Sequence, residues 1–396
     1  MRRGIYMVGL CAVFGGLGLS LLRGLAAREV DSQHLSARTL SDSRSSDPEF
    51  DYRRWRALSL LARERAVIYE REIEAKHLDE GMVVNRAVTG ESLGLCDSLL
   101  FSSLRYTALV KLGWTDKADD AWRAITGSYR SGRWVRHPRC SRKNTSRDQI
   151  FGLLTALSRN PPLHAEHLRT LLTIVEKTDG AIDPGPFYVS RLSPSLSELI
   201  KQMSLERGWE LKSLPDEIKI GFSTLEFDTW SASPGYTAHL SALVLWNEIE
   251  LWEQKRSVRS LADLIDGVSS KVYPLKLASQ RLQWSGQKLA ELDPQNLFFA
   301  WLKYRSAGAL TARVRADLLE RLLAMPAFPP DRLPQNCDRR ADYLWQRSSW
   351  EYGLEKPQAC HEEFSGVDYL WMVALLTDES KDILLSDVSK DLALRP

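Results

Sequence analysis

Along most of this chain, apolar residues recur at intervals of three and four positions, the spacing of one face of an α-helix. The pattern begins at Asp51, in the segment DYRRWRALSLLARERAVIYEREIEAKH. It continues in the segments 92–111, 116–127, 146–159, 163–178, 193–207, 236–254, 261–268, 276–290, 295–307, 313–325, 341–352 and 366–376. We therefore predict an all-α fold for residues 51–396. Only residues 209–230 alternate in places between apolar and polar, which predicts a small β-hairpin insertion there.

The connections between these predicted helices alternate in length. The helices ending at residues 111 and 159 pass to the next through a few residues, whereas the returns over 128–145, 179–192 and 207–235 are long. In a chain of antiparallel helix pairs, short turns lie on one face and long loops on the other. Alternate helices then run parallel, so helices starting near Cys96 and Ser146 would both present their N-termini on the long-loop face. This layout predicts an (α/α) toroid of alternating inner and outer helices.

The first 27 residues have the pattern of an export segment. MRRG supplies a charged start, Ile5 to Leu22 is apolar, and GLAA offers small residues for cleavage. An apolar run of this length fits a cleaved signal peptide or an uncleaved membrane anchor. Residues 28–50 are rich in Ser and charge and predict a flexible linker. We expect a periplasmic or secreted protein whose contact with a membrane is limited to this anchor.

Charge is nearly balanced over the body of the chain. Without Arg2, Arg3 and Arg23 of the leader, 50 basic residues face 51 acidic ones, which argues against nucleic-acid binding. One loop is the exception. Between residues 130 and 149 the single acid is Asp148, and the cations are Arg130, Arg133, Arg136, Arg139, Arg142, Lys143 and Arg147. So local an excess of positive charge predicts a site for an anionic ligand.

Four cysteines follow the leader, an even number in an exported protein. Three disulfide pairings are open to them. Proximity in sequence favours Cys96–Cys140 and Cys337–Cys360, and four buried unpaired thiols are the alternative.

Three segments resemble carbohydrate-active enzymes with the (α/α)-toroid architecture, both glycoside hydrolases and polysaccharide lyases. They are CDSLLFSSLRYTAL at 96–109, RWVRHP followed by SRDQIFGLLTAL at 146–157, and SGVDYLWMVALL at 365–376. The resemblance covers about a tenth of the chain and points to no particular family. It implies a catalytic domain over residues 51–396, with a cleft walled by the long loops.

Asp97 and Asp148 are the candidate catalytic carboxylates. If each begins a neighbouring inner helix, both face one cleft, as two-carboxylate glycoside hydrolysis requires. Asp148 would be the general acid and Asp97 its partner. The alternative use of these acids is helix capping, because Ser146 to Gln149 matches the capping-box pattern.

Arg136 and His137 suggest a second chemistry. In a polysaccharide lyase a cation neutralises a uronic carboxylate while a His removes the neighbouring proton. Arg136 and Arg147 would bind anionic groups in either reaction, and His137 would be catalytic in a lyase. The alternative is a solvated basic loop held by Cys140.

Aromatic residues could supply the sugar contacts. Trp134 and Trp230 have faces on which sugar rings stack. The segment FDTWSASPGYTAHL adds Asp228, Tyr236 and His239 to the predicted substrate-binding set. Tyr236 and His239 are spaced like one helix face, so core packing is the alternative for at least one of them.

No metal-binding or cofactor-binding motif is found, and we expect no cofactor. We therefore predict an exported enzyme that cleaves an acidic polysaccharide, with hydrolase favoured over lyase. A non-enzymatic helical-repeat binding or scaffold protein is the other alternative, because LGWTDKADDAWRAI at 112–125 resembles half of a tetratricopeptide unit. No second match follows at that family's repeat length.

Overall fold

The computed structural model divides the chain into two units, residues 1–51 and 52–396. It describes residues 48–87, 89–93, 95–130, 132–140, 145–158, 161–177, 181–184, 189–191, 194–205, 224–232, 236–266, 272–294, 296–324, 362–363 and 365–378. Of the first unit, only the first turn of helix α2 is therefore described. The predicted leader, 1–27, lies outside the described residues. Within the described ranges, no helix is long and apolar enough to cross a membrane.

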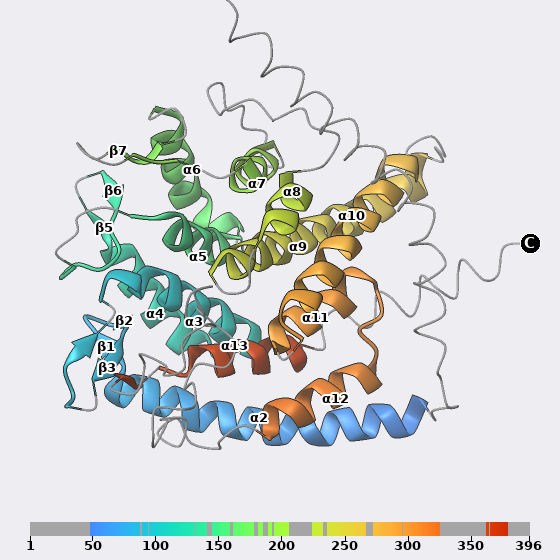
Figure 1. Ribbon diagram of the computed structural model, residues 1–396, viewed down its shortest axis with the longest axis horizontal. Helices are drawn as coiled ribbons and strands as arrows, with labels where there is room; N and C mark the ends of the chain where they lie inside the picture. The colour runs from blue at the N-terminus through green and yellow to red at the C-terminus, as the bar shows by residue number, and fades with distance from the viewer. Residues whose placement is uncertain are drawn as a thin grey trace, which may run out of the picture. The chain divides into compact units, whose positions relative to one another are not determined.

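The described part of the chain is mostly helical (Figure 1). The helices are α2 (Pro48–Lys76), η1 (Leu95–Asp97), α3 (Ser98–Leu112), α4 (Thr115–Gly127), α5 (Arg147–Leu157), α6 (Pro161–Lys177), α7 (Pro194–Leu205), α8 (Thr224–Ser231), α9 (Tyr236–Asp266), α10 (Val272–Leu292), α11 (Leu297–Ser306), α12 (Ala312–Leu323) and α13 (Val367–Leu376). The strands are β1 (Leu78–Asp79), β2 (Met82–Val83), β3 (Asn85–Ala87), β4 (Ser92–Leu93), β5 (Tyr129–Arg130), β6 (Arg133–Trp134), β7 (Ala181–Pro184), β8 (Val189–Arg191) and β9 (Glu362–Glu363).

Helices α3, α5, α11, α13 and the first half of α9 bury nearly all their described side chains. We call these the inner helices. Helix α3 packs against α5 and α13, and α9 packs against α5 and α11. Phe298 of α11 contacts Trp371 of α13 edge-on, and Trp246 of α9 contacts the same indole. Helices α9, α11 and α13 therefore share one aromatic cluster, and in Figure 1 α13 lies between α3 and α11.

The inner helices run in one direction. At their N-terminal ends, strand β3 before α3 pairs with β9 before α13, and Asn296 before α11 contacts His239 in the first turn of α9. At their C-terminal ends, Lys111 of α3 pairs with Asp378 after α13 at 2.8 Å. Helices α4, α6, α10 and α12 alternate with them along the chain. Each buries one face only, as the three- and four-residue spacing requires.

The structure agrees with most predicted helices and corrects others. Residues 224–230, part of the predicted hairpin, form helix α8, because Leu225 and Thr229 are buried one turn apart. The rest of that hairpin lies outside the described residues. Helix α9 continues to Asp266 and includes the start of the segment predicted as a separate helix at 261–268. Helix α2 begins at Pro48, inside the predicted linker, and the predicted helix at 341–352 lies outside the described residues.

Candidate functional site

The N-terminal ends of three adjacent inner helices each carry an acid. Asp97 immediately precedes α3, Asp148 is the second residue of α5, and Asp368 is the second residue of α13. Asp148 and Asp368 are buried, whereas the Asp97 side chain is 44% exposed. Helix N-termini favour negative charge, so these acids suit their positions electrostatically. The two predicted carboxylates, Asp97 and Asp148, thus lie at the same end of neighbouring helices.

A buried hydrogen bond ties the start of α3 to the start of α5. The backbone N–H of Leu100 donates to Oε1 of Gln149 at 3.0 Å. Nε2 of Gln149 donates to Oδ2 of Asp148 at 2.9 Å, and the hydroxyl of Ser146 bonds to its Oδ1. The Asp148 carboxylate is therefore held in place by two side chains from its own helix start, one of which is anchored on α3.

Neither predicted carboxylate serves as a helix cap. The capping-box alternative requires Ser146 to bond back to α5, but Ser146 makes no side-chain cap bond and Gln149 bonds to Leu100 and Asp148 instead. Asp97 occupies the N-cap position of α3 and likewise makes no side-chain cap bond.

Other helices in the same protein are capped in the ordinary way. Asn296 accepts the backbone N–H groups of Phe298 and Phe299 at the start of α11, and Thr311 caps α12. Asp97, at the N-cap position of α3, and Asp148, in the first turn of α5, make no such cap bond.

Arg136 brings positive charge to this end of the inner helices. Its Nη1 donates to the carbonyl of Cys96 at 3.1 Å and lies 3.8 Å from Oδ1 of Asp97. Two buried polar atoms nearby in the chain have no hydrogen-bond partner among the described residues, Nε of Arg136 and Oγ1 of Thr145. Buried polar atoms are nearly always bonded to protein or water. Nε–H of Arg136 is therefore able to donate to a ligand or water, and the Thr145 hydroxyl is able to donate or accept.

The predicted Cys96–Cys140 disulfide is present, with its Cα atoms 5.3 Å apart. It joins the residue before Asp97 to the basic loop that carries Arg136. Arg147, also predicted to bind an anion, is half-buried as the first residue of α5. Cys337, Cys360, Arg142 and Lys143 lie outside the described residues.

His137 and Trp134 do not reach the surface, contrary to their predicted roles. His137 is fully buried, and backbone groups of Asp79 and Arg139 lie 3.0 Å from its two ring nitrogens. Trp134 is 2% exposed and packs against Tyr129 and His167, which leaves no free face for a sugar ring. The many cations of this loop predict that it is solvated, but the side chains of His137 and Trp134 are buried.

The remaining predicted contacts have different environments. Trp230, near the end of α8, is 56% exposed. Asp228 accepts hydrogen bonds from the backbone and hydroxyl of Ser195, so it holds the first turn of α7. His239 is buried, with Nε2 3.3 Å from Nδ2 of Asn296 and its ring against Phe299. Tyr236 begins α9, and its side chain lies outside the described part.

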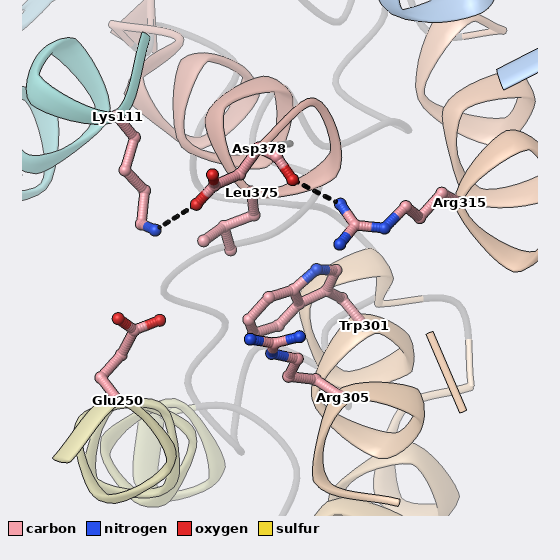
Figure 2. A pocket seen from close by; sticks show the side chains of 7 residues that line it. All are labelled: Lys111, Glu250, Trp301, Arg305, Arg315, Leu375 and Asp378. Carbon is pink, nitrogen blue, oxygen red and sulfur yellow. Dashed lines mark hydrogen bonds and ion pairs between the residues drawn. The ribbon is translucent and has the colours of Figure 1, made fainter. Parts of the chain in front are cut away.

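A small cavity lies at the opposite, C-terminal end of the inner helices (Figure 2). It is lined by Lys111, Glu250, Trp301, Arg305, Arg315, Leu375 and Asp378. Figure 2 shows Glu250 facing Lys111 across the space, while Arg315 donates to the Asp378 carbonyl at 3.1 Å. The space holds about one water molecule, so it cannot accept a sugar ring. Among the described residues, we take the N-terminal end, where Asp97, Asp148 and Arg136 lie, as the candidate site.

Sequence reasoning overlooked three residues near this end. Asp368 occupies in α13 the position that Asp148 has in α5, and the segment SGVD before an apolar helix was its signal. Asn296 and Asp79 gave no such signal, because their roles depend on His239 and His137, which are distant in sequence.

No known protein family matches this chain, and no curated protein is detectably similar to it.

Proposed function

We propose that this protein is an exported glycan-active enzyme that cleaves an acidic polysaccharide by two-carboxylate hydrolysis. The observation that carries the proposal is the pair Asp97 and Asp148. They lie at the starts of two inner helices that the Leu100–Gln149 bond joins, and neither acts as a cap. Side-chain capping of the helix therefore does not explain either acid.

Their surroundings support different roles in the reaction. Asp148 is only 5% exposed, and we assign it the role of the general acid that gives its proton to the glycosidic oxygen. Asp97 is more exposed and lies beside Arg136, so it is the partner that acts on the opposite face of the sugar. The separation of the two carboxyl groups around the bound sugar decides between inversion and retention.

The acidic character of the substrate follows from the cations around this pair. Arg136 lies 3.8 Å from Asp97, and its Nε has no hydrogen-bond partner among the described residues. Arg147 begins the same helix as Asp148. A guanidinium binds a carboxylate or sulfate in bidentate fashion. Trp230 offers the exposed aromatic face that stacks on a sugar.

An (α/α) toroid is the architecture that best fits these contacts. The inner helices run parallel and alternate along the chain with helices that bury one face. Helix α13, the last described, packs on α3, and β9 pairs with β3. In an open helical repeat each unit contacts only its neighbours, so contact between distant ends weakens the scaffold alternative. The lyase alternative is weakened by His137, whose ring is buried.

To test this proposal, the full chain is incubated with neutral and acidic polysaccharides. New reducing ends and ultraviolet-absorbing unsaturated ends are measured separately. We expect reducing ends from an acidic polysaccharide, lost in Asp148→Asn and Asp97→Asn and retained in the control Asp119→Asn on the exposed face of α4. Unsaturated ends would favour the lyase instead. No cleavage of any glycan by the folded wild-type protein would overturn the proposal.

A further inference from the structure

His137 is a fully buried residue of the basic loop. The backbone N–H of Arg139 donates to its Nδ1 at 3.0 Å, and its Nε2 lies 3.0 Å from the carbonyl of Asp79. Because Nδ1 accepts a backbone N–H, the hydrogen-bond network assigns the ring proton to Nε2, which donates to the carbonyl. Both nitrogens are thus engaged by the main chain, and none is directed toward a substrate.

The same stretch of loop is fixed at two further points. Nη1 of Arg139 pairs with Oδ2 of Asp79 at 3.0 Å, and Cys140 is joined to Cys96. These contacts fasten residues 137–140 to the β1–β2 hairpin and to the start of α3. Arg136 comes directly before this fastened stretch, and its guanidinium reaches the Cys96 carbonyl and Asp97.

We infer that His137 is a positioning residue, which holds the loop so that Arg136 stays beside Asp97 for binding the anionic group of the substrate. The inference rests on the proposed function for the role given to Arg136. The hold that His137 has on the loop is independent of that function. This positioning role replaces the expectation that His137 carries a proton in the reaction.

Two variants separate the two ring contacts. His137→Asn keeps an acceptor near the position of Nδ1, whereas His137→Gln keeps a donor near Nε2, and neither side chain titrates. His137→Ala removes both contacts. Hydrogen exchange of the Arg139 amide reports directly on the bond to Nδ1. We expect this exchange to quicken at least tenfold in His137→Ala and to slow again in His137→Asn, with the circular dichroism unchanged.

Kinetics on the acidic polysaccharide provide the second readout. If His137 positions Arg136, His137→Ala raises KM severalfold, as Arg136→Ala does, His137→Asn raises it less, and both keep kcat and its pH profile. The double variant Arg136→Ala/His137→Gln then raises KM no more than Arg136→Ala alone. If instead His137→Asn loses kcat and one limb of the pH profile while Arg139 stays protected, His137 transfers a proton and the inference is wrong.

The two proposals fail in different ways. If the wild-type protein cleaves no glycan, the proposed function falls, and the exchange experiment still decides whether His137 holds the loop. If exchange at Arg139 is the same in His137→Ala as in the wild type, the positioning role falls even when activity is present. Should His137→Ala not fold, the Asn and Gln variants supply the same comparison.

Discussion

The backbone N–H of Leu100 and the side-chain carbonyl of Gln149 form a buried hydrogen bond, 3.0 Å long, between the first turns of α3 and α5. Replacing Gln149 with Leu leaves this N–H without an acceptor and also removes a donor to Asp148. We expect a loss of about 1–3 kcal/mol in the free energy of unfolding, measured by urea titration. The control Gln287→Leu, which removes an exposed bond to Glu291 on α10, is expected to cost less than about 0.5 kcal/mol. If both variants lose the same free energy of unfolding, the buried Leu100–Gln149 bond contributes no more stability than an exposed bond.

Gly152 allows the closest approach of the same two helices. A Cβ at this position would lie 2.7 Å from Cα of Leu100, so the backbone of one of the two helices would have to shift. Gly152→Ala is therefore expected to destabilise the protein by about 1–3 kcal/mol or more. Gly127→Ala is the matched control, because no heavy atom lies within 4 Å of its Cβ and it belongs to α4. It should be neutral or stabilising by up to about 1 kcal/mol in thermal unfolding.

The Cys96–Cys140 disulfide closes a loop across 44 positions of the sequence. Limiting the unfolded chain in this way stabilises a protein by about 2–4 kcal/mol. We expect Cys96→Ser/Cys140→Ser to lose that amount and to bind an acidic oligosaccharide more weakly, because the loop carrying Arg136 is released. Unreduced peptide mapping checks the bond itself. A mapped pair joining Cys96 or Cys140 to another cysteine would contradict this prediction.

Glu70 and Arg105 form a buried ion pair between α2 and α3, with Nη2 of Arg105 2.5 Å from Oε1 of Glu70. Burial raises the pKa of the Glu70 carboxyl, although Arg105 opposes this by lowering it. A carboxyl whose pKa is higher in the folded state contributes stability below its unfolded pKa, about 4.3, and loses it as pH rises through the folded pKa. Stability measured against pH should therefore fall less across this window in Glu70→Gln.

Breaking the pair is expected to be costly in itself. Arg105→Met leaves the Glu70 carboxylate buried without its cation, and such losses are about 3–5 kcal/mol. The double variant Arg105→Met/Glu70→Leu should recover much of that stability. Arg123→Met removes an exposed pair with Asp120 and should change stability by less than about 1 kcal/mol. If Arg105→Met behaves like Arg123→Met, the pair is not buried in solution.

Helix periodicity predicted most of the described helices, because amphipathic helices such as α4 and α12 bury one face only. It also identified α3, α5 and α13 as apolar helices, and an acid was noted at the start of α3 and α5 but not of α13. Periodicity gave the wrong prediction where the pattern of a short segment is compatible with both a strand and a helix. In TLEFDTW the apolar residues fit both a strand and a helix, and packing against α10 and α7 selects the helix.

Chemistry was harder to predict than secondary structure, because burial of a polar residue depends on distant partners. Buried His137 has its Nε2 beside the carbonyl of Asp79, which is 58 positions earlier in the chain. Asp148 is held through Gln149, whose partner Leu100 is 49 positions away. The sequence shows which residues are able to act on a substrate, and only the folded contacts show which are already committed to structure.

The two tryptophans proposed for sugar binding should now behave differently. Trp134 is buried against Tyr129 and His167, so Trp134→Ala is expected to cost about 3–5 kcal/mol of stability. Trp134→Phe retains much of the packing and removes an Nε1–H that has no partner among the described residues, so it should cost far less.

Trp230 is 56% exposed, and Trp230→Ala should leave the free energy of unfolding within about 0.5 kcal/mol of the wild type. An aromatic stacking contact contributes about 0.5–1.5 kcal/mol, so losing it should weaken glycan binding roughly 2- to 10-fold. Isothermal titration with an acidic oligosaccharide measures this, beside urea titrations of all three variants. Unchanged affinity in Trp230→Ala would remove Trp230 from the substrate site and leave the carboxylate pair and Arg136 to account for binding.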